Sequence, residues 1–243
     1  MRWLFLESPP DDGPGNMALD EALMSRAART GEAVFRVYSW RTPTLSLGRN
    51  QRARGDYDLD AARTLGVAFV RRPTGGRALL HDHEITYSAT LPATSAADAD
   101  AAYAFLNDVL LAAISALGVR ATRAAATQSI PPGLRPCFDA PSEHEIVVGE
   151  RKLVGSAQWR RGGALLQHGS ILVRDDQPMI ARVMKSPITT PPAATLVDAL
   201  GREPTVSELA ALLRASLSRI VDATVTTLDD PRITGDTEAL RAT

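Results

Sequence analysis

The feature that most limits how this chain can fold is a pair of adjacent glycines between two strand-like segments. The apolar run Val67–Val70 precedes the pair, and the alternating segment Ile85–Ala89 follows it; both patterns are typical of β-strands. Gly75 and Gly76 permit positive φ angles and a close approach of the backbone to a ligand. We therefore predict a strand, a turn and a strand. Two interpretations of the turn stay open: the floor of a small-molecule pocket, or a tight hairpin with a solvated tip.

Basic side chains surround the glycine pair. Arg71 and Arg72 precede it and Arg77 follows it. Guanidinium groups present forked donors that suit phosphate and carboxylate groups. The segment lacks both the Gly-x-Gly-x-x-Gly pattern of dinucleotide-binding turns and the Gly-Lys-Ser/Thr ending of a P-loop, so neither kind of nucleotide site is predicted.

Two histidines and two acidic residues follow the turn, in the order His81, Asp82, His83 and Glu84. The two histidines point to the same face of a strand only if no turn separates them. The further thiolates or third histidine of a usual zinc site are also missing. We therefore predict no metal site here.

Apolar periodicity elsewhere predicts helices mixed with locally paired strands. Helices are expected at Met17–Arg29 with Asn16 as the N-cap, Asp58–Gly66, Ala101–Leu117, Pro178–Met184 and Val206–Val221. Strands are expected at Ala33–Trp40, Thr44–Leu47, Glu145–Val148, Lys152–Gln158 and Ala164–Val173. This arrangement favours the α+β class, with mixed, mostly antiparallel sheets flanked by helices. We expect one domain over residues 1–243, in which 176–243 form a helical C-terminal part.

Charge and composition limit the possible partners. The formal net charge is −1, so no basic field is available to recruit nucleic acid or an anionic membrane. One cysteine allows no internal disulfide, which fits a reducing cytosol. The N-terminal apolar segment meets Glu7 and two prolines too early for a signal peptide, and we expect no apolar run long enough to span a bilayer. The sequence thus predicts a cytoplasmic protein.

Cys137 is the first candidate for chemistry. A lone cysteine is usually a small buried apolar residue. This one lies in a proline-rich segment, Ala124–Pro141, which is a poor place for core, and Arg123 and Arg135 could lower the pKa of its thiol. A structural role and a nucleophilic role therefore both stay open.

Lys152 is the second candidate. The chain has 27 basic residues, yet Lys152 and Lys185 are its two lysines. A chain so biased to arginine can keep a lysine where an amine is required. The small residues Gly155, Ser156 and Ala157 follow on the same predicted strand, where they would permit close approach of a ligand. An exposed turn lysine is the equally good structural interpretation.

Four motifs in a fixed order resemble the lipoate–protein ligase A and biotin–lipoyl ligase superfamily. The most specific is Arg71–Asp82, and Lys152–Gln158 resembles the lysine motif of the same superfamily. The others are Asn16–Ala22 and Trp40–Gln51. The resemblance implies the fold of the class II synthetase and biotinyl/lipoyl ligase catalytic domain.

Within that superfamily, three details resemble the octanoyltransferases of the LipM type. Arg77 stands where ATP-dependent ligases tend to carry a third glycine, and the segments Cys137–Ser142 and Gln167–Leu172 have the LipM pattern. Many ligases also carry a C-terminal accessory domain, for which this chain leaves little room. Glu143–His144 departs from the pattern, since aromatic residues are expected there.

The resemblance implies an acyl transfer with no cofactor. The donor would be octanoyl-acyl carrier protein, and the acceptor a lysine of a lipoyl domain, most simply glycine cleavage H protein. Cys137 would carry the octanoyl group as a thioester, and Lys152 would assist it. The substrate-binding residues implied are Arg71, Arg72, Gly75, Gly76, Arg77, His81, Gly155, Ser156, Ala157, His168 and Gly169. Arg160 and Arg161 are further candidates for docking acidic partner domains.

Three alternatives stay open. An ATP-dependent lipoate ligase, which would need ATP and magnesium, would use Arg71, the glycines and Lys152 around an acyl-adenylate. An octanoyl amidotransferase would move the group between lipoyl domains through Cys137. A non-catalytic module would only bind acyl carriers. The sequence leaves the oligomeric state open, with a monomer favoured.

Overall fold

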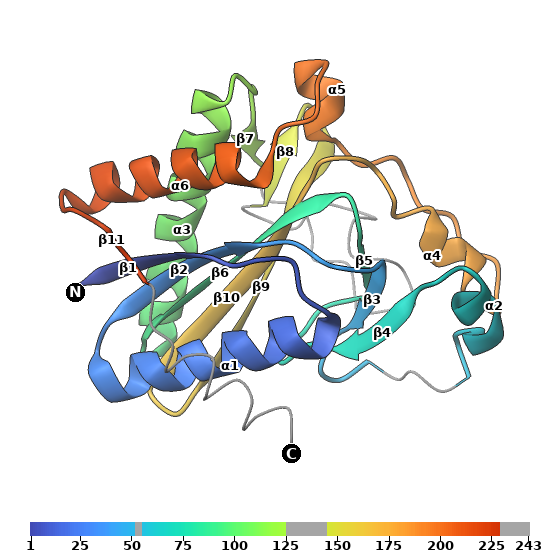
Figure 1. Cartoon of the computed structure of the whole chain (residues 1–243), viewed down its shortest axis with the longest axis horizontal. Helices are drawn as coiled ribbons and strands as arrows, with labels where there is room; N and C mark the ends of the chain where they lie inside the picture. Colours follow the sequence, from blue (N-terminus) through green and yellow to red (C-terminus); the bar gives the residue numbers. More distant parts are fainter. Residues whose placement is uncertain (52–54, 125–144, 229–243) are drawn as a thin grey trace.

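The computed structural model describes residues 1–51, 55–124 and 145–228 (Figure 1). Its strands are β1 (Trp3–Glu7), β2 (Ala33–Tyr38), β3 (Thr44–Leu47), β4 (Ala68–Arg71), β5 (Leu79–His81), β6 (Glu84–Pro92), β7 (Thr122–Arg123), β8 (Ile146–Val148), β9 (Arg151–Arg161), β10 (Ala164–Leu172) and β11 (Thr226–Thr227). Its helices are α1 (Gly13–Thr30), α2 (Leu59–Thr64), α3 (Ala96–Ala116), α4 (Met179–Arg182), α5 (Leu196–Leu200) and α6 (Val206–Val221).

The larger sheet forms the centre of the molecule. Among the described residues it has eight strands, in the order β11-β1-β2-β6-β10-β9-β8-β7. The β11–β1 and β1–β2 pairs are parallel and the other pairs are antiparallel. The predicted α+β class, with mixed and mostly antiparallel sheets, is therefore confirmed.

Helices cover both faces of this sheet. Helix α1 packs against β6 and β10 on one face, and α3 and α6 pack against each other on the opposite face (Figure 1). The main core lies under α3 and α6, where Leu106, Leu110 and Ile114 of α3 are fully buried. These three side chains recur at helical spacing, so the predicted apolar stripe is core.

The smaller sheet holds the glycine pair. Its strand order is β4-β3-β5, with β3 parallel to β4 and antiparallel to β5. The segment with Gly75 and Gly76 therefore joins two strands that lie on opposite sides of β3. The hairpin interpretation is wrong for this reason. The hydroxyl of Thr74, directly before the pair, lies 2.7 Å from Nε2 of His168 on β10, so the glycine segment contacts the larger sheet.

Helix α1 begins earlier than predicted. Asp12 is its N-cap and accepts a hydrogen bond from the backbone N–H of Gly15, so the helix starts at Gly13. Asn16, the predicted cap, is instead a buried residue inside the helix, and its side-chain oxygen accepts a hydrogen bond from Arg36. The error arose because Asp and Asn are both good caps, and the first turn carries Gly13 and Pro14 rather than an apolar residue.

Helix α3 also begins earlier, at Ala96, because Ser95 and Asp98 form a capping box. It is the one helix in the described residues that is long and apolar enough to cross a membrane by length and composition. This is an exception to the expectation that no such segment exists. The helix packs against the sheet and α6 in the main core, which accounts for its apolar character.

The strand Thr44–Leu47 and the helix Val206–Val221 have the predicted bounds. Two further elements follow α4 in the described part of the chain. They are α5, which the prediction missed, and β11, which pairs in parallel with β1. Both elements are too short to produce a periodic pattern.

Candidate active site

The glycine turn between β4 and β5 is held by the side chain of Arg72. Its Nε and Nη2 donate to the carbonyl of Gly75 at 3.2 and 2.9 Å, and Nη2 also donates to the carbonyl of Arg77 at 2.6 Å. Its Nη1 donates to the carbonyl and the hydroxyl of Ser46, both at 3.0 Å. A fork of this kind fixes several acceptors in one plane. Arg72 is buried, and it shapes the turn from within.

A second turn packs directly against the glycine turn. The N–H of Arg49 donates to the carbonyl of Thr74 at 2.9 Å, and a Cβ at Gly48 would lie 2.1 Å from the carbonyl oxygen of Gly76. Gly48 is therefore required for this close approach. A Cβ at Gly75, in contrast, would have no neighbour within 4 Å among the described residues. That part of the chain therefore leaves open space beside the backbone at Gly75.

Arg71 fixes the second turn. Its Nη1 donates to the carbonyls of Gly48, Arg49 and Gln51, at 2.7, 3.1 and 2.8 Å. Both arginines before the glycine pair thus bind backbone carbonyls of the two turns. The paired arginines were predicted as anion binders, and these contacts show that each also has a structural task.

His168 joins the glycine turn to α1. Its Nε2 lies 2.7 Å from the hydroxyl of Thr74, and its Nδ1 lies 3.3 Å from Oδ2 of Asp20. Burial lowers the pKa of His168, and this outweighs the hydrogen bond and charge of Asp20, which raise it. A neutral ring beside a carboxylate donates from Nδ1, so Nε2 accepts from the Thr74 hydroxyl.

Asp20 is itself buried and paired. Burial raises the pKa of this carboxyl. The hydrogen bond from His168 and the charge of Arg36 lower the pKa and together outweigh burial, so the net shift is downward. Nη1 of Arg36 donates to Oδ1 of Asp20 at 2.8 Å, and the hydroxyl of Ser88 donates to the same oxygen at 2.8 Å. Asp20 therefore anchors α1 to the sheet below the glycine turn.

His81 forms a second buried network. Its Nδ1 lies 2.7 Å from Oε1 of Glu84, and its Nε2 lies 2.8 Å from the hydroxyl of Ser46. The ring stacks on Trp40, with the centroids 4.0 Å apart. Because Ser46 also accepts from Arg72, the network continues from the buried carboxylate to the glycine turn. His81 and His168 were both predicted as substrate-binding residues. In the structure each is hydrogen bonded to a residue that forms or holds the glycine turn.

The segment Gly155–Ala157 on β9 lies beside β10. Gly155 is opposite Ser170, Ser156 opposite Gly169 and Ala157 opposite His168. A Cβ at Gly169 would lie 2.5 Å from the carbonyl of Gly155 and 2.7 Å from a ring carbon of Tyr87. Gly169 is therefore required for packing between neighbouring strands.

Lys152 lies at the start of β9, in the hairpin that β9 forms with β8. Its Nζ is 2.7 Å from Oε1 of Glu145, and both side chains are buried. The pairing of β8 with β9 is irregular at this point, because Val147 is opposite Lys152 whereas Ile146 is opposite Val154. Such bulges commonly redirect a side chain near a functional site. The interpretation of Lys152 as an exposed turn lysine is wrong.

The predicted site residues thus fall into two groups. The first surrounds the glycine turn and is joined by hydrogen bonds and by the β9–β10 pairing. The second is Lys152 with Glu145, three residues before Gly155 on β9. Ser170 belongs to the first group, since it is opposite Gly155 and its hydroxyl donates to Glu84 at 2.8 Å. Cys137 lies outside the described residues.

Sequence reasoning missed several members of these networks. All of them have buried side chains; they are the aromatic residue Trp40 and the polar residues Asp20, Ser46, Thr74, Glu84 and Glu145. A signal was present for some of them. Polar residues on segments with the periodicity of core are expected to have buried partners, and Asp20 and Ser46 occupy such positions in α1 and β3. Trp40 and Glu84 lacked this signal, because each lies beside a turn.

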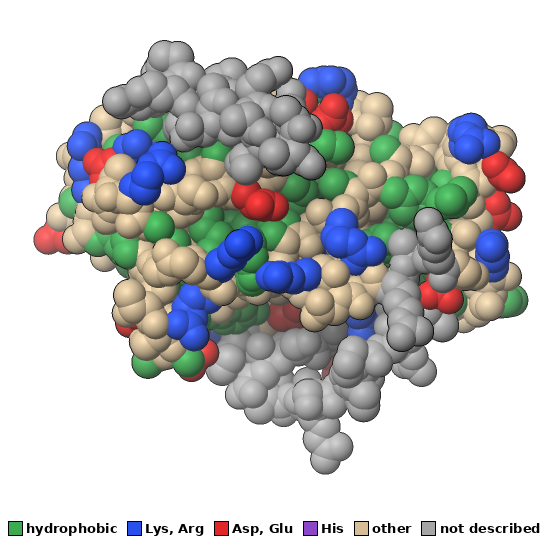
Figure 2. Space-filling model, turned by 90° about the horizontal axis from the view of Figure 1, so that it is seen from below, with side chains coloured by type: hydrophobic (Ala, Val, Ile, Leu, Met, Phe, Trp, Pro, Cys, Tyr) green, Lys and Arg blue, Asp and Glu red, His purple; other side chains and the backbone are tan. Residues whose placement is uncertain are grey.

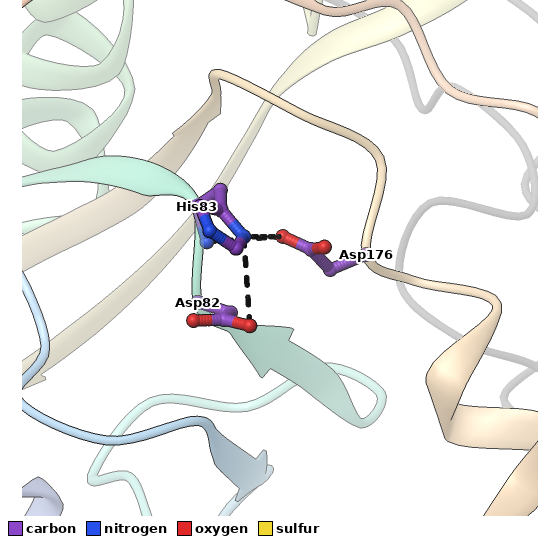
Figure 3. Close-up of side chains that lie close together, drawn as sticks. All are labelled: Asp82, His83 and Asp176. Carbon is purple, nitrogen blue, oxygen red and sulfur yellow. Dashed lines mark hydrogen bonds and ion pairs between the residues drawn. The ribbon is translucent and has the colours of Figure 1, made fainter.

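A polar cluster lies at the turn between β5 and β6 (Figure 3). Nδ1 of His83 lies 3.0 Å from Oδ2 of Asp176 and 3.5 Å from Oδ2 of Asp82, and the N–H of His83 also donates to Asp176. Donor atoms this close could hold a metal ion. The contacts of His83 with Asp176 also attach the chain around Asp176 to the turn between β5 and β6. His83 is half exposed and His81 is buried, because the turn separates them.

Basic and apolar side chains lie side by side on the face of the molecule shown in Figure 2. One aromatic residue with basic neighbours is Trp159, near the end of β9. The guanidinium carbons of Arg49 and Arg161 lie 5.0 and 5.7 Å from its ring centroid, within the range of cation–π attraction. The exposed Arg49 follows Gly48 in the turn that packs on the glycine pair, so this basic surface adjoins the candidate site.

Comparison with known families and proteins agrees with this geometry. Residues 12–218 match the model of the lipoyl protein ligase A/B catalytic domain. Octanoyltransferase LipM of Symbiobacterium thermophilum is 37% identical, covering 92% of this chain and 88% of that protein. Octanoyltransferase LipM of Carboxydothermus hydrogenoformans is 41% identical, covering 75% of this chain and 69% of that protein.

Solved structures share the fold. A lipoate-protein ligase A bound with ATP superimposes with a TM-score of 0.78 at 24% identity, covering 99% of this chain and 92% of that one. A bipartite lipoate protein ligase from Thermoplasma acidophilum superimposes with a TM-score of 0.76 at 23% identity, covering 100% and 91%. At this identity the likeness establishes the fold alone.

Proposed function

We propose, on the premise that this chain belongs to the lipoyl protein ligase A/B catalytic domain family as a LipM-type octanoyltransferase, that it transfers octanoyl groups from acyl carrier protein to a lipoyl domain. The observation that carries the proposal is the similarity to LipM enzymes over most of both chains. The buried amine of Lys152 supports it, because an acyl transfer with a thiol nucleophile benefits from a nearby cation.

The proposed reaction has two steps. In the first, the Cys137 thiolate attacks the carbonyl carbon of the carrier's octanoyl thioester. A bond from sulfur to carbon forms, the bond to the carrier's sulfur breaks, and the carrier leaves as its thiol after taking up a proton. In the second, the amine of the acceptor lysine attacks the new thioester. The amide bond forms, the amine loses a proton, and the Cys137 thiol is regenerated.

Several of the predicted residues have a role in this proposal. Lys152 stabilises negative charge on sulfur and on the carbonyl oxygen as it develops. Backbone N–H groups at Gly75 and Gly76 are the candidates for the oxyanion site, because the described residues leave open space beside Gly75. The small residues Gly155 and Ala157 leave room for the acyl chain beside the strand.

The octanoyl chain supplies much of the binding free energy. Burial of eight carbons stabilises the complex by about 6 kcal/mol at ~0.8 kcal/mol per methylene. A chain shorter by two methylenes loses ~1.6 kcal/mol, so this contribution gives a chain-length selectivity of about 15-fold.

The partners are two acidic domains. We propose octanoyl-acyl carrier protein as the donor and glycine cleavage H protein as the acceptor, in the cytoplasm and without a cofactor. Exposed arginines near Trp159, among them Arg49, Arg160 and Arg161, offer positive charge to such partners. Opposite charge raises association rates and orients the encounter.

A transfer assay tests the proposal. The protein is incubated with octanoyl carrier protein and an apo-lipoyl domain without ATP, and the intact mass of the acceptor is recorded. We expect an octanoylated acceptor with the wild type and none with Cys137→Ala. A requirement for ATP, together with pyrophosphate exchange driven by free lipoate, would reject the transferase and support a ligase.

A further inference from the structure

The ion pair between Lys152 and Glu145 consists of two buried charges, which packing alone does not require. Its two charged groups are 2.7 Å apart, and the residues are 3% and 6% exposed. The chain is strongly biased to arginine, yet it places a lysine here. Removing two charges from water is costly even when they pair, so a pair of this kind is retained where the charge itself is useful.

The backbone on both sides of the pair is fixed. The carbonyl of Glu145 accepts a hydrogen bond from the N–H of Ala124 at 2.7 Å, and the carbonyl of Lys152 accepts one from the N–H of Ala194 at 3.0 Å. Gly149 closes the hairpin between them with a φ of 61°. Glu145 therefore has a backbone hydrogen bond at its own position, and its carboxylate has a defined place beside the amine.

We infer that Glu145 is a positioning residue for the acyl transfer, which holds the Lys152 side chain in one orientation. The inference rests on the proposed function. A lysine has a flexible four-carbon side chain. A carboxylate 2.7 Å from its amine limits the rotamers that the side chain adopts, and so fixes where the amine lies.

Glu145 takes no part in bond making in this scheme. In each step the ammonium offsets the negative charge that develops on sulfur and on the carbonyl oxygen, and Glu145 stays a carboxylate throughout. Its removal should therefore slow the chemical steps and leave substrate affinity nearly unchanged. That pattern separates it from a residue that only stabilises the fold.

Three single variants test the inference. Glu145→Gln keeps the shape and removes the charge, Glu145→Asp keeps the charge and shortens the side chain, and Glu150→Gln removes an exposed carboxylate from the turn of the same hairpin. Single-turnover rates of acyl loading and of transfer are measured with the full-length protein, and each is divided by the folded fraction.

We expect Glu145→Gln to lower both rates by about 10- to 100-fold, with KM changed by less than about 3-fold, because a misplaced group commonly costs this much. Glu145→Asp should recover part of the rate, and Glu150→Gln should match the wild type. Wild-type rates per folded Glu145→Gln molecule would overturn the inference.

A double variant guards against loss of folding. Glu145→Gln combined with Lys152→Met removes both charges, which is less harmful to stability than removing one. We expect Glu145→Gln to slow the reaction in the wild type but to have no further effect in the Lys152→Met background. An equal effect in both backgrounds would contradict a role through Lys152.

The outcomes distinguish this inference from the proposed function. If the wild type forms no octanoyl adduct on Cys137, the proposed function fails. If the wild type forms the adduct and Glu145→Gln forms it at the same rate, the transferase stands and the positioning role fails.

Discussion

Around the glycine turn the protein uses forked hydrogen bonds to backbone carbonyls, whereas at the start of β9 it uses a buried ion pair. Arg72 binds Gly75, Arg77 and Ser46 together, so loss of one contact leaves others in place. Lys152 and Glu145 depend on each other's charge. The first arrangement fixes the shape of the backbone and the second fixes the position of a charge. Substitutions in the two regions should therefore affect stability and activity in different proportions.

The largest effect is expected at the ion pair. Lys152→Met should lower the single-turnover transfer rate by about 100- to 10,000-fold, because the cation is lost from the reaction. It should also lower the free energy of unfolding by about 3–5 kcal/mol, since Glu145 then keeps a buried charge without this amine. Urea unfolding and single-turnover assays measure the two effects. A variant that keeps near wild-type transfer would separate Lys152 from catalysis.

A smaller effect on activity is expected at the glycine turn. Arg72→Lys keeps the charge and removes the fork, so bonds to Gly75, Arg77 or Ser46 are lost. We expect the free energy of unfolding to fall by about 2–4 kcal/mol and the rate per folded molecule to fall by only about 10-fold. A loss of activity as large as that of Lys152→Met, without loss of stability, would mean that Arg72 acts on substrate directly.

Substitutions at two glycines separate a role in shaping the backbone from a role in binding substrate. Gly48→Ala should lower the free energy of unfolding by about 2–3 kcal/mol, because its Cβ would meet the carbonyl of Gly76 at 2.1 Å. Gly75→Ala should change stability by less than about 0.5 kcal/mol, since its Cβ would meet no atom of the described residues within 4 Å. If the acyl group binds there, kcat/KM should nonetheless fall by about 10-fold. Unchanged kcat/KM in Gly75→Ala would place the substrate elsewhere.

The smallest effect is a pH dependence of stability at His168. Because burial lowers the pKa of this histidine below its ordinary value, the unfolded state binds the proton more readily. Its contribution to stability is fully present above about pH 6.5 and is lost as the pH falls below that value. We expect His168→Gln to reduce the slope of Tm against pH between about 6.5 and 5. An unchanged slope would show that other groups control it.

Asp20 makes the stability of the fold depend on pH in a lower pH range than His168 does. Its folded pKa is also below the ordinary value, so its contribution is present above about pH 3.8 and is lost on further acidification. The two groups therefore both weaken the fold in acid, and their separate windows allow the same titration to distinguish them.

The sequence predicted elements with strong local signals and missed those that depend on tertiary contacts. The bounds of β3 and α6 follow from an alternating pattern and a capped periodic helix. The position of β3 between β4 and β5 could not be predicted, because strand order depends on contacts that no local pattern records. The elements α5 and β11 are too short to produce a periodic pattern, so no local signal predicts them.

Part of the candidate site was predictable for a similar reason. Lys152, His81 and His168 were identified from motifs, whereas their partners Glu145, Glu84 and Asp20 were not. A motif records the residue types along a segment. The pairing of Asp20 with His168 joins positions 148 residues apart, and only the folded chain brings them together.

The proposed transfer requires a covalent octanoyl group at Cys137. Wild-type protein is mixed with octanoyl carrier protein in the absence of ATP and acceptor, quenched in acid, and analysed by intact mass and peptide mapping. We expect an octanoyl adduct on Cys137 that disappears when an apo-lipoyl domain is added. Absence of any adduct in the wild type, or an adduct that persists in Cys137→Ala, would contradict it.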